Sequence, residues 1–142
     1  MTIPSGPVPS FPKTKGLQSG IALQKISDMI GSGATDLVAK AGGTKAAATP
    51  VTATNVRVAT VANAADSILL PLGYVGLEIC IANAGNNSMQ VFGNTNDTIN
   101  DVVTATGVAQ ANGVTAIYRC LQTTGSVAAG TYVAQWYRVL SA

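Results

Sequence analysis

The sequence predicts an all-β protein: an antiparallel β-sandwich of jelly-roll type, preceded by an extended N-terminal arm and one short helix. Seven or eight strand-like runs follow residue 50 at spacings of roughly ten residues, a pattern typical of sandwiches and jelly rolls. Turns rich in Gly and Asn separate these runs. The first 16 residues contain four prolines, which block helix and sheet hydrogen bonding and so predict an extended arm.

Residues 75–93 hold the most regular strand pattern. Apolar residues occupy alternate positions from Val75 to Ile81, as in a strand with one buried face. The pattern stops at residues 83–87, whose sequence NAGNN tolerates left-handed backbone conformations, and it resumes at 88–92. The spacing therefore predicts a β-hairpin, on which the rest of the sandwich is built.

A second hairpin is predicted around Asn112-Gly113, because this pair suits a two-residue type I′ turn. Its strands, and the others predicted in the sandwich, lie at residues 51–61, 68–72, 98–103, 108–111, 114–121 and 131–140.

The last predicted strand is aromatic. Tyr132 and Trp136 share one face of it, whereas Tyr137 points the other way. Together with Tyr74 and Tyr118 they could form a stacking platform for sugars or bases if several were exposed on one face. Aromatic residues in a terminal strand more often belong to the core or seal an edge, and we expect that role here.

Residues 20–30 are predicted to form a short helix. Their large apolar residues recur at offsets of three and four and make one stripe: Leu23, Ile26, Met29 and Ile30. Ser19 is a candidate N-cap, and Gly-Ser-Gly at 31–33 would end the helix. A helix this short is marginal alone, so the stripe should pack on its own sheet, the favoured case, or on a partner.

Residues 34–49 contain few large apolar groups and are predicted to be a connector with weak structure. We therefore divide the chain into two parts. Residues 1–44 form the Pro-rich basic arm with the short helix, and residues 45–142 form the β-sandwich domain.

Charge is scarce in this chain. Charged residues make up 10% of the sequence, against a usual share of about a quarter. Few charges oppose the meeting of two such surfaces, so we expect a homo-oligomer, either a dimer or a trimer. The net charge of +2 is too small to indicate nucleic-acid binding.

The charge is unevenly distributed. Six basic and two acidic residues lie in the first 57 positions, whereas the remaining positions hold two basic and four acidic residues. The simpler interpretation is a solvated arm that happens to carry more lysines. The alternative is a basic N-terminal part that docks on an acidic partner surface.

The residues needed for common chemistry are missing. The chain has no histidine, the commonest general base and transition-metal ligand. Cys80 and Cys120 are predicted to be reduced thiols, and two cysteines alone cannot complete a structural zinc site. Asp97 and Asp101 could pair for acid/base work or bind a cation, but the segment lacks EF-hand spacing and a surface turn is expected. We predict no enzymatic activity, cofactor or metal.

The sequence also lacks membrane signals. No stretch approaches 18 apolar residues, and the Pro-rich N-terminus has no apolar core of a secretory signal. We therefore expect no contact with a membrane.

The segment from residue 79 to residue 120, together with the late Trp136-Tyr137 pair, resembles structural proteins of tailed bacteriophages. The matching parts are a strand ending in Ile81-Ala82-Asn83-Ala84-Gly85, the pair Val91-Phe92, the sequence DTIN at 97–100, the Ala-rich turn at 109–113, and Trp136-Tyr137. Residues 48–72 fit the same pattern. The resemblance covers roughly residues 44–140 and leaves the arm and the helix without a counterpart.

This resemblance implies a capsid decoration, or cement, protein that binds the outer surface of the major capsid shell and stabilises it by bridging subunits. Its partners would be the major capsid protein and other copies of itself. It would reside on the virion after assembly in the host bacterial cytoplasm. The alternative is a receptor- or glycan-binding module of a head fibre or tail fibre, with loops around Asn86, Asn94 and Thr124 as its tips.

The arm is the predicted capsid contact, because a Pro-rich segment cannot satisfy its backbone locally and would become ordered on a partner. The residues expected to make this contact are Pro4, Pro7, Phe11, Lys13, Lys15 and Lys25.

Overall fold

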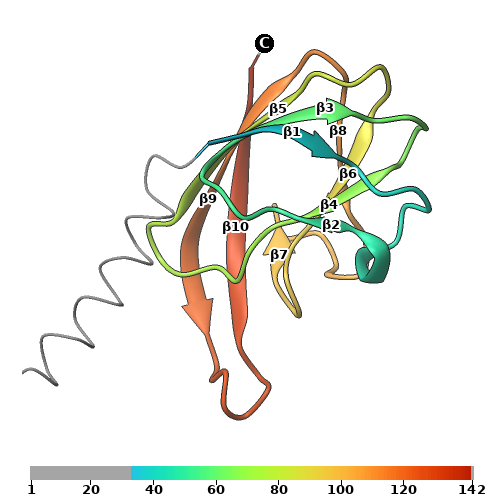
Figure 1. Ribbon diagram of the computed structural model, residues 1–142. Coiled ribbons are helices and arrows are strands. Elements are labelled where there is room, and N and C mark those ends of the chain that lie inside the picture. Colours follow the sequence, from blue (N-terminus) through green and yellow to red (C-terminus); the bar gives the residue numbers. More distant parts are fainter. Residues whose placement is uncertain (1–32, 142) are drawn as a thin grey trace, which may run out of the picture.

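The structure is a computed structural model that describes residues 33–141 as two β-sheets enclosing one apolar core (Figure 1). Sheet A has six strands in the order β1-β3-β5-β9-β10-β7, and sheet B has four in the order β2-β4-β6-β8. The elements are β1 (Gly33–Val38), the 3-10 turn η1 (Lys45–Ala47), β2 (Thr49–Pro50), β3 (Asn55–Thr60), β4 (Ser67–Leu69), β5 (Glu78–Asn83), β6 (Met89–Phe92), β7 (Thr98–Ile99), β8 (Val108–Gln110), β9 (Thr115–Thr124) and β10 (Val133–Leu140). The predicted two-sheet, all-β architecture is confirmed.

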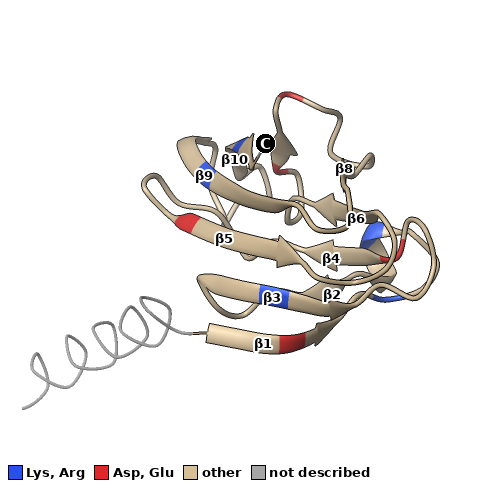
Figure 2. Ribbon diagram, turned by 90° about the horizontal axis from the view of Figure 1, so that it is seen from above, with Lys and Arg blue, Asp and Glu red and all other residues tan. Residues whose placement is uncertain are grey.

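The chain alternates strictly between the two sheets from β1 to β9. As a result β1, β3 and β5 lie parallel in sheet A, and β2, β4 and β6 lie parallel in sheet B. Gly33 pairs with Asn55, 22 positions later, so one winding through both sheets takes about that many residues. Figure 2 shows β1, β3, β5 and β9 side by side.

The antiparallel jelly-roll prediction is therefore wrong for the first half of the described chain. Antiparallel pairing begins only when β9 joins β5, β10 joins β9 and β8 joins β6. The error has a simple cause. Alternation of apolar and polar residues reports which face of a strand is buried, but it carries no information on the direction of the neighbouring strand.

Neither predicted hairpin forms. The turn after Asn83 carries the chain from β5 in sheet A to β6 in sheet B, and the Asn112-Gly113 turn carries it from β8 in sheet B to β9 in sheet A. Gly113 has φ of +74°, while Asn112 does not have the positive φ that a type I′ turn needs. Both segments are turns, as predicted, but they connect strands of different sheets.

The N-terminal part of the described chain contains more structure than expected. Within the predicted connector at 34–49, β1 pairs with β3 and extends sheet A, and η1 follows it. No residue of β1 is fully buried, since it is an edge strand, and this explains why its sequence lacks large apolar groups. The predicted arm and the predicted helix at 20–30 lie outside the described residues.

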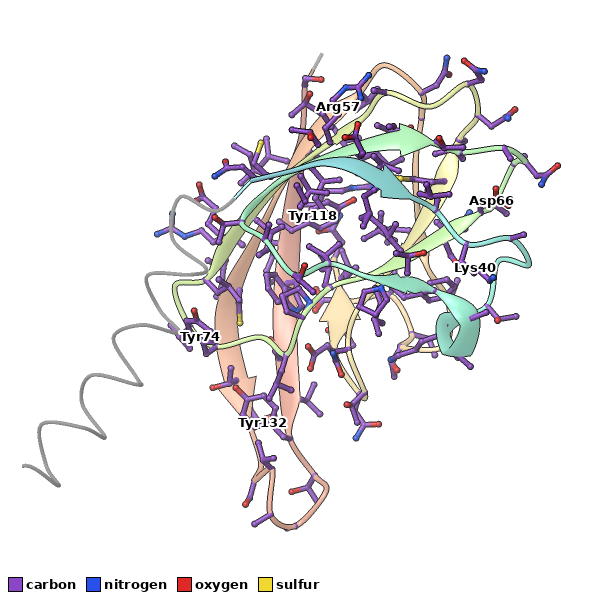
Figure 3. All side chains as sticks on the ribbon, viewed as in Figure 1. Lys40, Arg57, Asp66, Tyr74, Tyr118 and Tyr132 are labelled. Atoms are coloured by element: carbon purple, nitrogen blue, oxygen red, sulfur yellow. The ribbon has the colours of Figure 1, made fainter. Side chains whose placement is uncertain are left out.

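A buried polar network fixes the crossing between the sheets. Gln110 on β8 donates through Nε2 to the carbonyls of Ile81 (2.8 Å) and Val114 (2.9 Å), and its Oε1 accepts from the Tyr118 hydroxyl (2.9 Å). The Gln110 carbonyl accepts from the Asn83 side-chain amide at 3.0 Å. Figure 3 places Tyr118 in the interior of the sandwich. These groups are almost wholly excluded from solvent, so each hydrogen bond replaces one that water would otherwise make.

The turn after β5 depends on the same Asn83. Its amide donates to the Asn87 carbonyl, and its Oδ1 accepts from the Gly85 backbone N–H, both at 3.0 Å. Gly85 lies so close to Val61 that an added Cβ would come within 2.5 Å of the Val61 backbone nitrogen. Only glycine fits there without moving the neighbouring strand end.

The free energy of unfolding depends on pH through Tyr118, because this tyrosine is buried. Burial raises the pKa of Tyr118 to about 12, against the smaller lowering effect of the nearby Arg138. The folded state therefore keeps the phenolic proton at pH values where the unfolded chain, with a pKa near 10, has lost it. The contribution of Tyr118 to the free energy of unfolding is therefore complete below pH 10 and is lost as the pH rises toward 12.

We expect the free energy of unfolding to fall by about 1.3 kcal/mol between pH 9 and pH 11 because of this group. Urea titrations at both pH values measure the loss. The Tyr118→Phe variant, although less stable at every pH, should show a smaller decrease over the same interval. An equal decrease in both proteins would contradict the assignment.

Candidate functional site: an uncharged end of the sandwich

Two loops and one neighbouring residue form a surface without charge at one end of sheet A. We define this uncharged end as residues 70–77, which connect β4 to β5, residues 125–132, which connect β9 to β10, and Thr95. The two loops contain no Asp, Glu, Lys or Arg. They carry several exposed apolar side chains, of which Val75 and Val127 are each 62% exposed and Tyr74 is 45% exposed. Figure 3 shows Tyr74 and Tyr132 on this side of the molecule.

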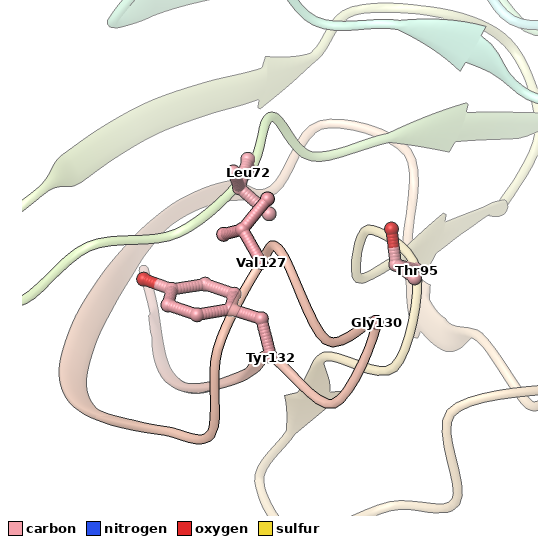
Figure 4. Close-up of a pocket in the computed structure, with 5 residues that line it drawn as sticks. All are labelled: Leu72, Thr95, Val127, Gly130 and Tyr132. Atoms are coloured by element: carbon pink, nitrogen blue, oxygen red, sulfur yellow. The ribbon is translucent and has the colours of Figure 1, made fainter.

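A small depression lies between the loops. It is lined by Leu72, Thr95, Val127, Gly130 and Tyr132 (Figure 4). The side chains of Leu72 and Val127 approach each other across it, beside the Tyr132 ring. No lining residue is charged, so the depression suits an apolar side chain of a protein partner better than an ionic ligand.

Internal hydrogen bonds hold the two loops in place. The Tyr132 hydroxyl donates to the Gly73 carbonyl at 2.6 Å and so joins one loop to the other. Within the second loop, Thr131 donates its backbone N–H to the Ser126 carbonyl, and its hydroxyl accepts from the Ser126 N–H, both at 3.1 Å. The surface is therefore preorganised, which reduces the conformational entropy that binding would cost.

A buried carboxylate supports the uncharged end from below. Asp97 is 1% exposed, and its two oxygens accept from the Ala134 backbone N–H (2.8 Å) and from Trp136 Nε1 (3.1 Å). Gly73 packs directly on these groups, because an added Cβ would lie 2.5 Å from the Ala134 Cβ. Asp97 thus positions the start of β10 and the only tryptophan beneath the exposed loops.

The expectation that Asp97 and Asp101 both lie in a surface turn is therefore wrong for Asp97. Asp101 is exposed and accepts from the Tyr137 hydroxyl at 3.3 Å. The two carboxylates have separate partners and do not form a pair for acid/base chemistry. Within residues 33–141 there is no group of three His, Cys, Asp or Glu residues that could hold a metal ion.

A partly buried lysine contacts Thr95 of the uncharged end. Lys45 on η1 donates from Nζ to the Thr95 carbonyl and, at 3.2 Å, to Thr104 Oγ1. Burial lowers the pKa of Lys45, while the negative charge of Asp97 acts in the opposite direction. The ammonium group ties η1 to the segment after β6 and is already occupied.

The cysteines are free, as predicted. Cys120 is buried on the inner face of sheet A, and burial, followed by the charge of Asp97, raises the pKa of its thiol. Cys80 is half-buried on the outer face of the same sheet. A raised pKa leaves little thiolate at neutral pH, so Cys120 is poorly suited to act as a nucleophile.

The structure places the remaining predicted site residues as follows. Trp136 and Tyr118 are fully buried, which confirms a core role and excludes them from a stacking platform. Asn86 follows β5 and Thr124 ends β9, and because these strands are antiparallel the two loops lie at opposite ends of sheet A. The predicted arm contacts at Pro4, Pro7, Phe11, Lys13, Lys15 and Lys25 lie outside the described residues.

The uncharged end was missed at the level of sequence. Its signal was the absence of charge from residue 120 to residue 137 and from 67 to 77, which becomes meaningful only when both segments meet at one end of the fold.

Comparison with known proteins adds no identification: no family model, curated protein or solved structure matches the chain. Within residues 33–141, no helix has the length and apolar character needed to cross a membrane.

The role of Asp97 can be tested by Asp97→Asn. The amide keeps one acceptor but turns a donor toward a backbone N–H or the indole N–H, so a buried hydrogen bond is lost. We expect the free energy of unfolding to fall by about 2–4 kcal/mol, measured by urea titration followed by circular dichroism. The matched control Asp101→Asn, on the surface, should change it by less than about 0.5 kcal/mol. Similar losses in both variants would refute the supporting role.

Proposed function

We propose that this protein is a non-enzymatic structural component of a bacteriophage virion, a decoration protein that binds the outer surface of the capsid shell and bridges its subunits. The observation that carries the proposal is the uncharged end. An exposed, preorganised apolar surface with an aromatic rim and no charge has the composition of the centre of a protein interface. The sequence resemblance to tailed-phage structural proteins supplies the identity of the partner.

The point where the described chain begins supports the same assignment. Gly33 begins β1, which runs parallel to β3 and β5, so β1 starts at the end of sheet A where β5 starts. The β4–β5 loop of the uncharged end lies at that end, where the Gly76 N–H donates to the Cys120 carbonyl. We propose that the arm, which precedes Gly33 in the sequence, binds the same partner as the uncharged end.

In this proposal the uncharged end provides a fixed apolar contact, and the arm reaches a neighbouring capsid subunit. Each contact is weak alone. Because the arm and the domain are covalently linked, binding of one raises the effective concentration of the other, and many copies together resist expansion of the shell.

The uncharged end is tested by Val127→Asp. A charge placed beside the depression must be desolvated on binding, so we expect capsid affinity to fall by about tenfold or more, with little change in stability. Co-sedimentation of purified protein with undecorated capsids measures the affinity. Val38→Asp is the control, since Val38 is also exposed but ends β1 at the other end of the sheet. Equal affinities for the two variants would exclude the uncharged end as the capsid contact.

The arm is tested by deletion of residues 1–16 in the same assay. We expect a loss of affinity of about tenfold or more, because the bridging contact is removed and only the domain contact remains. Unchanged binding would show that Pro4, Pro7, Phe11, Lys13 and Lys15 do not contact the capsid. A glycan array on the intact protein addresses the fibre alternative, since a decoration protein should show no saccharide preference.

A further inference from the structure

The outer face of sheet A carries a row of apolar side chains that nothing in residues 33–141 covers. The strand registers place Cys80 beside Ile117 and Ile117 beside Val139, across β5, β9 and β10. Their chain neighbours Ile79, Ile81, Ala116 and Tyr118 are buried on the inner face, so the row points outward. We call these three residues the outer row. Ile117 is 39% exposed and Val139 69% exposed.

Charged residues flank the outer row on both sides. One residue pair toward the uncharged end, Glu78 lies beside Arg119, which lies beside Tyr137. On the other side, Arg57 lies beside Ala82, which lies beside Thr115. Figure 2 shows these charges as single positions on β3, β5 and β9; sheet A also carries Asp36 on β1, beside β3, and Arg138 on β10. The face is thus an apolar strip between two borders that each carry charge.

We propose that this face is the contact between two copies of the chain, related by a two-fold axis that runs along the outer row. Such an axis sets each residue of the row against its own equivalent, so Cys80 meets Cys80, Ile117 meets Ile117 and Val139 meets Val139. Two sheets in this arrangement lie about 10 Å apart with their side chains in contact.

The flanking charges fit this symmetry. The two-fold axis exchanges the two borders, so Glu78 of one copy lies opposite Ala82 of the other and next to that copy's Arg57. Arg119 lies opposite Thr115. No charge faces a like charge, and one carboxylate on each copy gains an opposite partner. An ion pair that also fixes orientation is the usual role of charges at the border of an apolar interface.

This surface differs from the uncharged end, so the dimer proposal and the capsid proposal can fail independently. A dimer through sheet A leaves both uncharged ends accessible, at opposite ends of the dimer, because the two-fold axis reverses the strand direction between the copies.

The sequence provides a direct test, because the chain has only two cysteines and Cys120 is buried. Two sheets about 10 Å apart hold facing cysteines too far apart for a direct disulfide. The full-length protein is therefore treated with a short bismethanethiosulfonate cross-linker, which joins two nearby thiols through its spacer, and is separated on non-reducing gels. We expect a covalent dimer in the unmodified protein and in Cys120→Ser, and none in Cys80→Ser. Sedimentation should show a dimer that Ile117→Lys weakens by about tenfold or more, whereas Val127→Lys at the uncharged end leaves it intact.

Two results would overturn the proposal. The first is a monomer in sedimentation that gives no Cys80-dependent cross-link. The second concerns another occupant, the chain's own segment at residues 20–30 with its predicted apolar stripe. If that segment covers the row, the same cross-linker applied to the Met29→Cys, Cys120→Ser variant gives a monomer with an internal link to Cys80 in place of the dimer. Gln24→Cys, on the opposite side of the predicted helix, is the control for nonspecific cross-linking.

Discussion

The fold depends on hydrogen bonds that Gln110 makes in the interior, where the two sheets meet. A chain that changes sheet after every strand from β1 to β8 must bring backbone groups of its crossings into the core, and these groups need partners there. One glutamine satisfies the carbonyls of Ile81 and Val114 and the hydroxyl of Tyr118, while its own carbonyl is satisfied by Asn83. An apolar residue in place of Gln110 would leave the Tyr118 hydroxyl without this acceptor, at a cost of about 1–3 kcal/mol. It would also remove one donor from the Val114 carbonyl, which keeps the Asn83 backbone N–H. The two sheets can pack through apolar side chains because this small polar network satisfies the buried polar groups at their crossings.

The two ends of the sandwich are built on different principles. Asparagines and glycines form the turn after β5, and close packing against Val61 holds it in one conformation. At the other end, a carboxylate beneath the surface and the Tyr132 hydroxyl fix the loops, while Val75 and Val127 remain exposed. A surface whose support is buried and whose exposed groups are apolar can contact another protein without rearranging. This division between support and contact is the physical basis for assigning the interaction to the loops at 70–77 and 125–132.

Sequence reasoning recovered the class of the fold and most strand positions, because period-two alternation and turn residues are local signals. It failed where the deciding information is not local. The direction of strand pairing depends on which distant segments meet, so β3 and β5 look the same in a parallel winding as in a jelly roll. The edge strand β1 was missed because a strand with one neighbour needs few large apolar residues. Asp97 looked like a turn residue, since nothing in the sequence around it indicates that Ala134 and Trp136 donate to it.

The single tryptophan has a consequence for following the molecule in solution. Trp136 lies directly under Gly73, with its indole N–H held by a carboxylate and its ring shielded from solvent. Its emission is therefore set by one local electric field and one packing arrangement, both belonging to the loops above it. Binding that moves those loops or excludes water from their surface changes the tryptophan fluorescence of the protein. No attached dye is needed, and no second tryptophan contributes to the signal. Trp136 fluorescence is therefore an intrinsic probe of the uncharged end, the surface on which the proposed function depends.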